Sequence, residues 1–83
     1  MVTIRYNLFA LKHQLESVTG RSFPWTEVSR LSGINIGSIK NIAGNKTGRV
    51  DLDNLARLLA FFESEGMPIA LSDLFTVTHP GDS

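Results

Sequence analysis

The side chains with the clearest chemical potential lie between Asn35 and Arg49, and their chemistry is that of recognition. Asn35, Ser38, Lys40 and Asn41 place hydrogen-bond donors and acceptors close together along the chain. Asparagine amides pair with adenine edges and lysine ammonium groups with guanine acceptors, while basic and hydroxyl side chains bind phosphate oxygens. This segment therefore has the chemistry to bind a nucleic acid. A solvated polar helix face with no binding role has the same composition.

Signals of catalysis and metal binding are weak throughout the sequence. It contains no GxGxxG, P-loop or HExxH motif, and His13 and His79 have no companion at ligand spacing. Without cysteine, the sequence offers neither disulfides nor thiolate metal sites. Asp51 and Asp53 resemble two ligands of a calcium loop, but the glycine and distal glutamate of that loop are missing. We therefore expect no enzyme activity, no cofactor and no metal site, and we expect Asp51 to cap a helix.

Two short helices joined by a tight turn must position the recognition side chains. The first helix is expected over residues 25–32, with Val28 and Leu31 facing inward. Gly33 is expected to close this helix in a left-handed conformation. Asn35 is a suitable N-cap for the helix that follows.

The second helix of this pair is expected to carry the recognition face. Ile39 and Ile42 form its buried stripe, and the pair Gly44-Asn45 ends it. Because neighbouring residues on a helix point in different directions, Lys40 and Asn41 should then face outward. Ile36 and Gly37 are less usual at a recognition surface. Ile36 can contact a thymine methyl group or cover the core, and Gly37 allows close approach or is simply tolerated in a short helix.

The flanking segments supply three more expected helices. The first has an apolar stripe of Leu8, Leu11, Leu15 and Val18 and ends at Gly20. The fourth begins at Asp51, breaks at Gly66 and Pro68, and has an apolar face of Leu52, Leu55, Leu58, Leu59 and Phe62. A short last helix at 71–75 should place Leu74 and Phe75 in the core. The alternation Val2-Thr3-Ile4 is too short to predict a strand, so the expected fold is an all-α, compact five-helix bundle.

Composition and charge limit the class of protein. The chain has 83 residues, of which 42% are hydrophobic. We therefore expect one domain, 1–83, with a core over about 5–76 and a flexible tail over 77–83. There is no signal peptide and no apolar run long enough for a membrane span, which predicts a cytoplasmic protein. Residues 1–49 hold seven basic and two acidic side chains, a net of +5, and residues 50–83 a net of −5. Such polarity favours a polyanionic partner, although the acidic residues can also serve as helix caps.

The order and spacing of several short motifs resemble the Cro/C1-type (XRE-like) helix-turn-helix family of bacterial and phage regulators. The resemblance spans about Leu8 to Phe75. It rests on Phe23, Glu27-Val28, Leu31-Ser32-Gly33-Ile34-Asn35, Ile39, Ile42, Leu55, Leu58-Leu59 and Ser72-Asp73-Leu74-Phe75. It implies a lambda-repressor-like fold in which the second and third helices form the helix-turn-helix and the helix over 36–43 enters the DNA major groove.

The resemblance also implies roles for particular residues. Base-reading positions would be Asn35, Ile36, Gly37, Ser38, Lys40 and Asn41. Phosphate-binding positions would be Trp25, Thr26, Asn45, Lys46, Thr47 and Arg49, with Lys12 and Arg21 as further candidate cations. The chain departs from the family pattern in having Trp25 where a glutamine is usual and no acidic residue at Ala43. Its loops at 19–22 and 63–68 are also longer than usual.

The expected function is that of a sequence-specific, double-stranded-DNA-binding transcriptional regulator, a repressor, acting as a homodimer. Its two half-sites would lie about 34 Å apart, one turn of the DNA helix. Phe9, Phe61, Phe62 and Leu71 are candidates for either the core or the dimer face. The alternative is an antitoxin or adaptor on the same fold that binds a small protein such as a toxin, through the acidic second half and the 63–68 insertion, and that also binds DNA.

Overall fold

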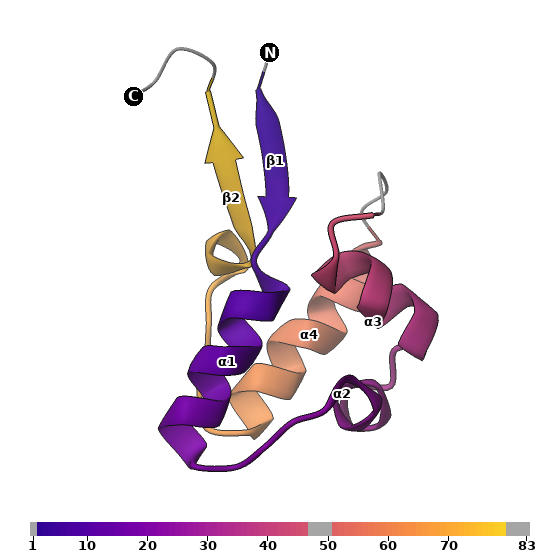
Figure 1. Cartoon of the computed structure of the whole chain (residues 1–83), viewed down its shortest axis with the longest axis vertical. Coiled ribbons are helices and arrows are strands. Elements are labelled where there is room, and N and C mark those ends of the chain that lie inside the picture. The colour runs from indigo at the N-terminus through magenta and orange to yellow at the C-terminus, as the bar shows by residue number, and fades with distance from the viewer. Residues whose placement is uncertain (1, 47–50, 80–83) are drawn as a thin grey trace.

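The computed structural model describes residues 2–46 and 51–79, and helices make up most of this part of the chain. The elements follow in the order β1 (Thr3–Tyr6), α1 (Leu8–Thr19), α2 (Trp25–Ser32), α3 (Ile36–Ala43), α4 (Leu52–Ser64), the 3₁₀ turn η1 (Leu71–Leu74) and β2 (Phe75–Thr78) (Figure 1). The helix-turn-helix pair therefore falls where the sequence predicted it, at α2 and α3.

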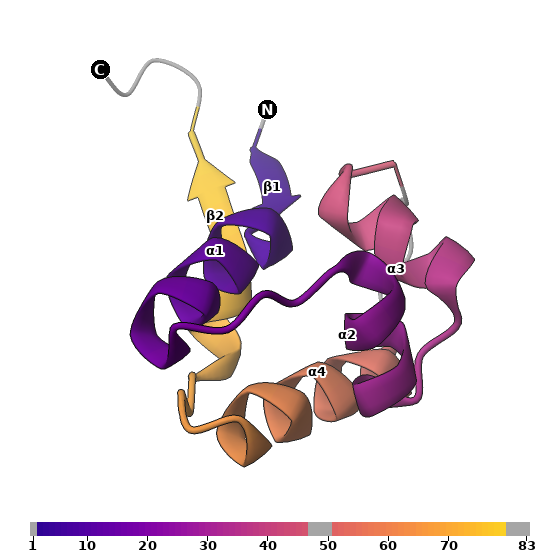
Figure 2. The same ribbon diagram turned by 60° about the horizontal axis from the view of Figure 1, so that its bottom comes forward.

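The helices pack around α4, and the two strands extend from one end of this body. Figures 1 and 2 show α1 beside the C-terminal part of α4, and α2 and α3 near the N-terminal part of α4. Helix α2 packs against both α3 and α4. The β1–β2 ribbon continues beyond the first turn of α1 and lies on the same side of the molecule as the C-terminal end of α3.

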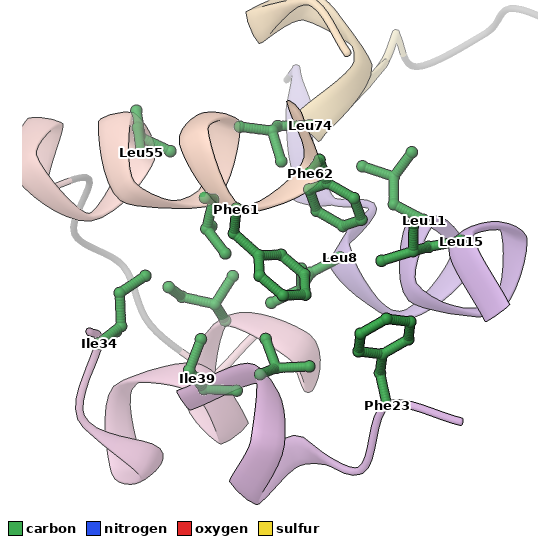
Figure 3. Close-up of a cluster of buried hydrophobic side chains, with 13 residues drawn as sticks. Leu8, Leu11, Leu15, Phe23, Ile34, Ile39, Leu55, Phe61, Phe62 and Leu74 are labelled. Carbon is green, nitrogen blue, oxygen red and sulfur yellow. The ribbon is translucent and has the colours of Figure 1, made fainter. Parts of the chain in front are cut away.

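The core is a single apolar cluster to which every helix contributes (Figure 3). Its buried members are Leu8, Leu11, Leu15, Phe23, Val28, Ile34, Ile39, Ile42, Leu55, Leu58, Phe61, Phe62 and Leu74. The Phe61 ring meets those of Phe23 and Phe62 edge-on, at centroid distances of 5.9 and 5.2 Å. Phe61 and Phe62 are thus core residues and do not supply a dimer face, whereas Phe9 and Leu71 are exposed.

The prediction of five helices was wrong at the C-terminal end. Residues 71–74 form one 3₁₀ turn, in which the Asp73 carboxylate accepts a hydrogen bond from the Ala70 N–H at 2.9 Å. The chain then extends as β2, which pairs antiparallel with β1 and brings Ile4 opposite Val77. The weak alternation at residues 2–4 therefore overlaps the start of a real strand, Thr3–Tyr6. Of the predicted flexible tail over 77–83, Val77 and Thr78 are part of β2, and residues 80–83 lie outside the described residues.

Three side chains predicted to face inward are exposed instead. Val18 is 62% exposed, Leu52 77% and Leu31 39%. Val18 lies in the last turn of α1, and Leu52 is the first residue of α4. The segment over 63–68 and the residue after it have a structural role: Gly66 takes a left-handed φ of 91°, and Met67 and Ile69 pack against the core.

Candidate nucleic-acid interface

The turn between α2 and α3 is built from local hydrogen bonds that end one helix and start the next. Gly33, at φ 76°, donates its N–H to the Ser29 carbonyl at 3.0 Å. The Ser29 hydroxyl donates to the carbonyl of Ile34, a residue that is only 3% exposed. The Asn35 side-chain oxygen accepts from the Gly37 N–H at 2.8 Å, as predicted for an N-cap. These bonds set the angle between the two helices.

A side chain of helix α4 contacts this turn directly. Arg57 donates through Nη1 to the Gly33 carbonyl at 3.0 Å and through Nε to Asp53 at 2.8 Å. A Cβ atom on Gly33 would lie 2.7 Å from Arg57 Nη1. The left-handed backbone of this turn therefore favours glycine, and a side chain at this position would also displace the Arg57 guanidinium group.

Helix α3 buries one face and exposes the other. Ile39 and Ile42 are 0% and 5% exposed, and they fix the helix against the core. Lys40 and Asn41 are exposed, and within the described residues their side chains form no hydrogen bond or ion pair. Their ammonium and amide groups are thus available to an external partner.

The other predicted base-reading residues lie at the first turn of the same helix. Asn35 and Gly37 are exposed, and Ile36 and Ser38 are partly buried. The Asn35 side-chain oxygen is already used in the helix cap, which leaves its amide nitrogen for recognition. A Cβ added at Gly37 would lie 3.0 Å from Asn35 Oδ1, so a larger residue there would require a small shift of the capping side chain.

The predicted phosphate-binding residues differ from one another in how far they are exposed. Trp25 is half-buried, packed against the Phe9 ring at 6.1 Å with Lys12 Nζ 4.8 Å above its own ring. It therefore acts as a packing residue between α1 and α2. Thr26 and Lys46 are exposed. Thr47 and Arg49 lie outside the described residues.

Asn45 has a structural role that sequence reasoning only half identified. Its left-handed φ of 55° ends α3 as predicted, and the N–H groups of Asn45 and Lys46 bond back to Ile42 and Asn41. Its side-chain amide, however, is committed to β1. Oδ1 accepts from the Tyr6 N–H at 2.6 Å, and Nδ2 donates to the Tyr6 carbonyl at 3.2 Å. This clamp joins α3 to a strand that lies 39 positions earlier in the sequence.

The basic side chains divide into paired and unpaired groups. Four are held in ion pairs: Lys12 with Glu16, Arg21 with Glu65, Arg30 with Glu27 and Arg57 with Asp53. The Arg30 hydrogen bond holds the pKa of the Glu27 carboxyl below its usual range, so this pair is charged at neutral pH. Within the described ranges, Arg5, Lys40 and Lys46 form no ion pair. Lys12 and Arg21, considered above as phosphate contacts, each have a carboxylate partner within the molecule.

The acidic side chains of the second half mostly have structural partners. Asp51 accepts from the Asp53 and Asn54 N–H groups at the start of α4, at 2.9 and 3.4 Å. Asp73 caps η1, while Asp53 and Glu65 are the ion-pair partners named above. Much of the charge asymmetry in the sequence thus reflects capping and pairing.

Other kinds of site find no support in the described part of the chain. It contains no group of three or more histidine, aspartate or glutamate side chains placed to hold a metal ion. None of its helices is long and apolar enough to cross a bilayer. No family model, curated protein or solved structure matches this chain, so the functional argument rests on the geometry of α2, α3 and their surroundings.

Proposed function

We propose that this protein is a sequence-specific, double-stranded-DNA-binding regulator of transcription, a repressor of the Cro/C1 type, with α3 as its recognition helix. The observation that carries the proposal is the contrast between the two faces of α3. Its inner face is fixed in the core, while Lys40 and Asn41 project outward without partners among the described residues. A helix held in this way can enter the major groove without first breaking intramolecular contacts.

The chemistry of the exposed groups fits base edges and phosphates. Asn41 can bond an adenine edge in two places, and Lys40 can donate to guanine, each contact contributing roughly 1–3 kcal/mol of discrimination. Lys46 extends beyond the C-terminal end of α3, where the DNA backbone would pass. Its side chain has no ion pair to lose within the described residues, so binding a phosphate costs no internal contact.

The proposal includes a homodimer, and the apolar face of the β1–β2 sheet favours it. Ile4 and Val77 are paired across the strands and are 63% and 51% exposed, and neighbouring Leu71 is 49% exposed. With Phe75 these side chains line a shallow apolar groove of about 640 Å³. None of them is charged, so two copies of this face can pack on each other without charge repulsion, in the two-fold arrangement that a palindromic site requires.

The decisive experiment selects binding sites from a random duplex library and then measures affinity by fluorescence anisotropy. We expect an enriched inverted repeat, and we expect Lys40→Ala with Asn41→Ala to lose most of the preference for it over random DNA. Arg21→Gln, which removes one charge far from α3, is the control. Folded wild-type protein that shows no duplex binding at about 50 mM salt would refute the proposal.

The antitoxin or adaptor alternative would use the acidic second half and the 63–68 segment as its binding surface. Asp51, Asp53, Glu65 and Asp73 have partners inside the molecule, so their carboxylates supply no observation that favours this alternative over DNA binding.

A further inference from the structure

A cleft of about 420 Å³ lies between the β1–β2 sheet, the start of α1 and the C-terminal end of α3. Arg5, Thr76 and Thr78 line it from the sheet, and Ala43 and Asn45 line it from the end of α3. Tyr6, Asn7, Phe9 and Ala10 complete the lining, so the cleft has an apolar part beside its polar groups. In Figure 1, β1 is the strand nearer to α3, so this cleft adjoins the proposed recognition helix.

The strand register explains why this side of the sheet is polar. Arg5 pairs with Thr76, and Thr3 pairs with Thr78. Side chains alternate between the two faces of a strand, so these four residues share one face, opposite to that of Ile4 and Val77. Of these residues, Arg5, Thr76 and Thr78 line the cleft, so the sheet contributes one cation and two hydroxyl groups to it.

The groups in the cleft are suited to an anion. Arg5 has no ion pair among the described residues, and no carboxylate is found among the described residues that line the cleft. The Thr78 hydroxyl makes no hydrogen bond in that part of the chain either, whereas Thr76 donates to Asn7 Oδ1 at 2.7 Å. A guanidinium group can bind phosphate through two parallel hydrogen bonds, and a nearby hydroxyl can donate a third.

The Asn45 clamp connects this cleft to the recognition surface. Its two hydrogen bonds to Tyr6 hold β1 beside the end of α3, so that Arg5 and Lys46 each adjoin one member of the clamp. The fold thereby brings Arg5 and Lys46, two cations that are distant in the sequence, to the same region of the molecule.

We propose that this cleft is a second phosphate-binding site, in which Arg5 and Thr78 hold the DNA backbone beside the groove that α3 reads. This inference rests on the proposed function and extends its footprint from the helix-turn-helix to the sheet. Each phosphate neutralised contributes about 0.9 to the slope of log affinity against log salt, which makes a single contact measurable.

The test compares Arg5→Gln with Arg21→Gln, two variants that make the same change in net charge. The probe is a random-sequence duplex of about 20 base pairs, titrated at several salt concentrations, because phosphate contacts do not depend on sequence. For Arg5→Gln we expect a salt slope smaller by about 0.9 and a dissociation constant about threefold to tenfold higher at 0.1 M salt. Arg21→Gln should match the wild type in slope, and Thr78→Val should raise the dissociation constant less than Arg5→Gln does.

The outcomes separate this inference from the proposed function. If Lys40→Ala weakens binding to the selected site but Arg5→Gln behaves like Arg21→Gln, the second site is wrong and the proposed function stands. If the wild type binds no duplex, both are wrong. Circular-dichroism melting of every variant shows whether a loss of affinity reflects loss of the fold. Rescue of the salt slope by Arg5→Lys would support a cationic role.

Discussion

Single side chains in this protein connect segments that are distant in the sequence. Asn45 ends α3 with its backbone and clamps β1 with its side chain. Glu16 on α1 accepts from the Phe23 N–H at 2.6 Å and so fixes the loop that leads into α2. Each residue is part of a helix or its end and also contacts a distant segment. Substitutions can separate the local contribution to stability from the tertiary one.

Asn45→Gly should remove the clamp while keeping the left-handed backbone. We expect a loss of about 1–2 kcal/mol in the free energy of unfolding, because the partly buried Tyr6 N–H loses its acceptor. Asn45→Ala should cost roughly 1 kcal/mol more, since alanine disfavours positive φ. Urea unfolding followed by circular dichroism measures both. Equal stability of Asn45→Gly and the wild type would show that the clamp contributes nothing.

The Glu16 carboxylate should make stability depend on acid pH. Its hydrogen bond from the Phe23 N–H, with help from Lys12, holds its pKa below its ordinary value of 4.5. Since the pKa is lower in the folded state, this stabilisation is complete above about pH 4.5 and is lost as pH falls through the folded-state pKa.

Glu16→Gln should therefore make the decline of the unfolding free energy below pH 4.5 shallower than in the wild type. Urea titrations at a series of pH values measure this slope. Glu63→Gln, an exposed position on α4, is the matched control and should leave it unchanged. If the unfolding free energy of Glu16→Gln declined with pH as steeply as that of the wild type, the Glu16 carboxylate would not be the source of the acid dependence.

At the scale of elements, the helix-turn-helix is held as much by α4 as by its own turn. Residues 33–35 leave one helix and cap the next, and Arg57 reaches from α4 to the Gly33 carbonyl at 3.0 Å. The orientation of α3, and therefore the direction in which Lys40 and Asn41 point, depends in part on this contact from outside α2 and α3.

Gly33→Ala should destabilise the fold by about 1–2 kcal/mol, because alanine strains the left-handed backbone. It also places a Cβ 2.7 Å from Arg57 Nη1. Thermal melts of Gly33→Ala alone and combined with Arg57→Ala separate these effects, since the second substitution relieves the clash but not the strain. Gly20→Ala is a useful comparison, because that glycine also has positive φ but a Cβ added to it would meet no atom within 4 Å. A Gly33→Ala variant as stable as the wild type would contradict this account.

At the scale of the whole molecule, the β1–β2 sheet has two unlike faces with different expected partners. Its polar face borders α3 and the proposed DNA backbone site, while its apolar face points away from that site. A two-stranded sheet is marginally stable by itself and gains from a covering layer. A second copy of the same face supplies that layer and also pairs two recognition helices.

Val77→Glu should convert the dimer to a monomer, because it would bury two carboxylates at the symmetric contact. Size-exclusion chromatography with light scattering over a concentration series measures the mass. Thr3→Glu places the same charge on the opposite face of the sheet and should leave the dimer intact. A wild type that remains monomeric at about millimolar concentration would eliminate this interface.

The sequence alone was sufficient for the local features. The ends of α2 and α3, the caps at Asn35 and Asp51 and the left-handed Gly33 were all predicted, because short-range sterics and hydrogen bonds determine them. The inward positions of Ile39 and Ile42 followed from helical periodicity. Periodicity failed for Val18 and Leu52, two residues at helix ends, because the spacing of apolar residues does not tell how far along a helix the core extends.

Only the tertiary structure decided the features that join distant segments. The pairing of β1 with β2 depends on residues at opposite ends of the chain, and each strand is too short to have a clear pattern of its own. The Asn45 clamp, the Glu16 bond to the loop and the Arg57 support of the turn likewise have no local signature. The sequence did not point to Arg5 for the same reason, since its place in a cleft beside the end of α3 exists only once the fold brings the two segments together.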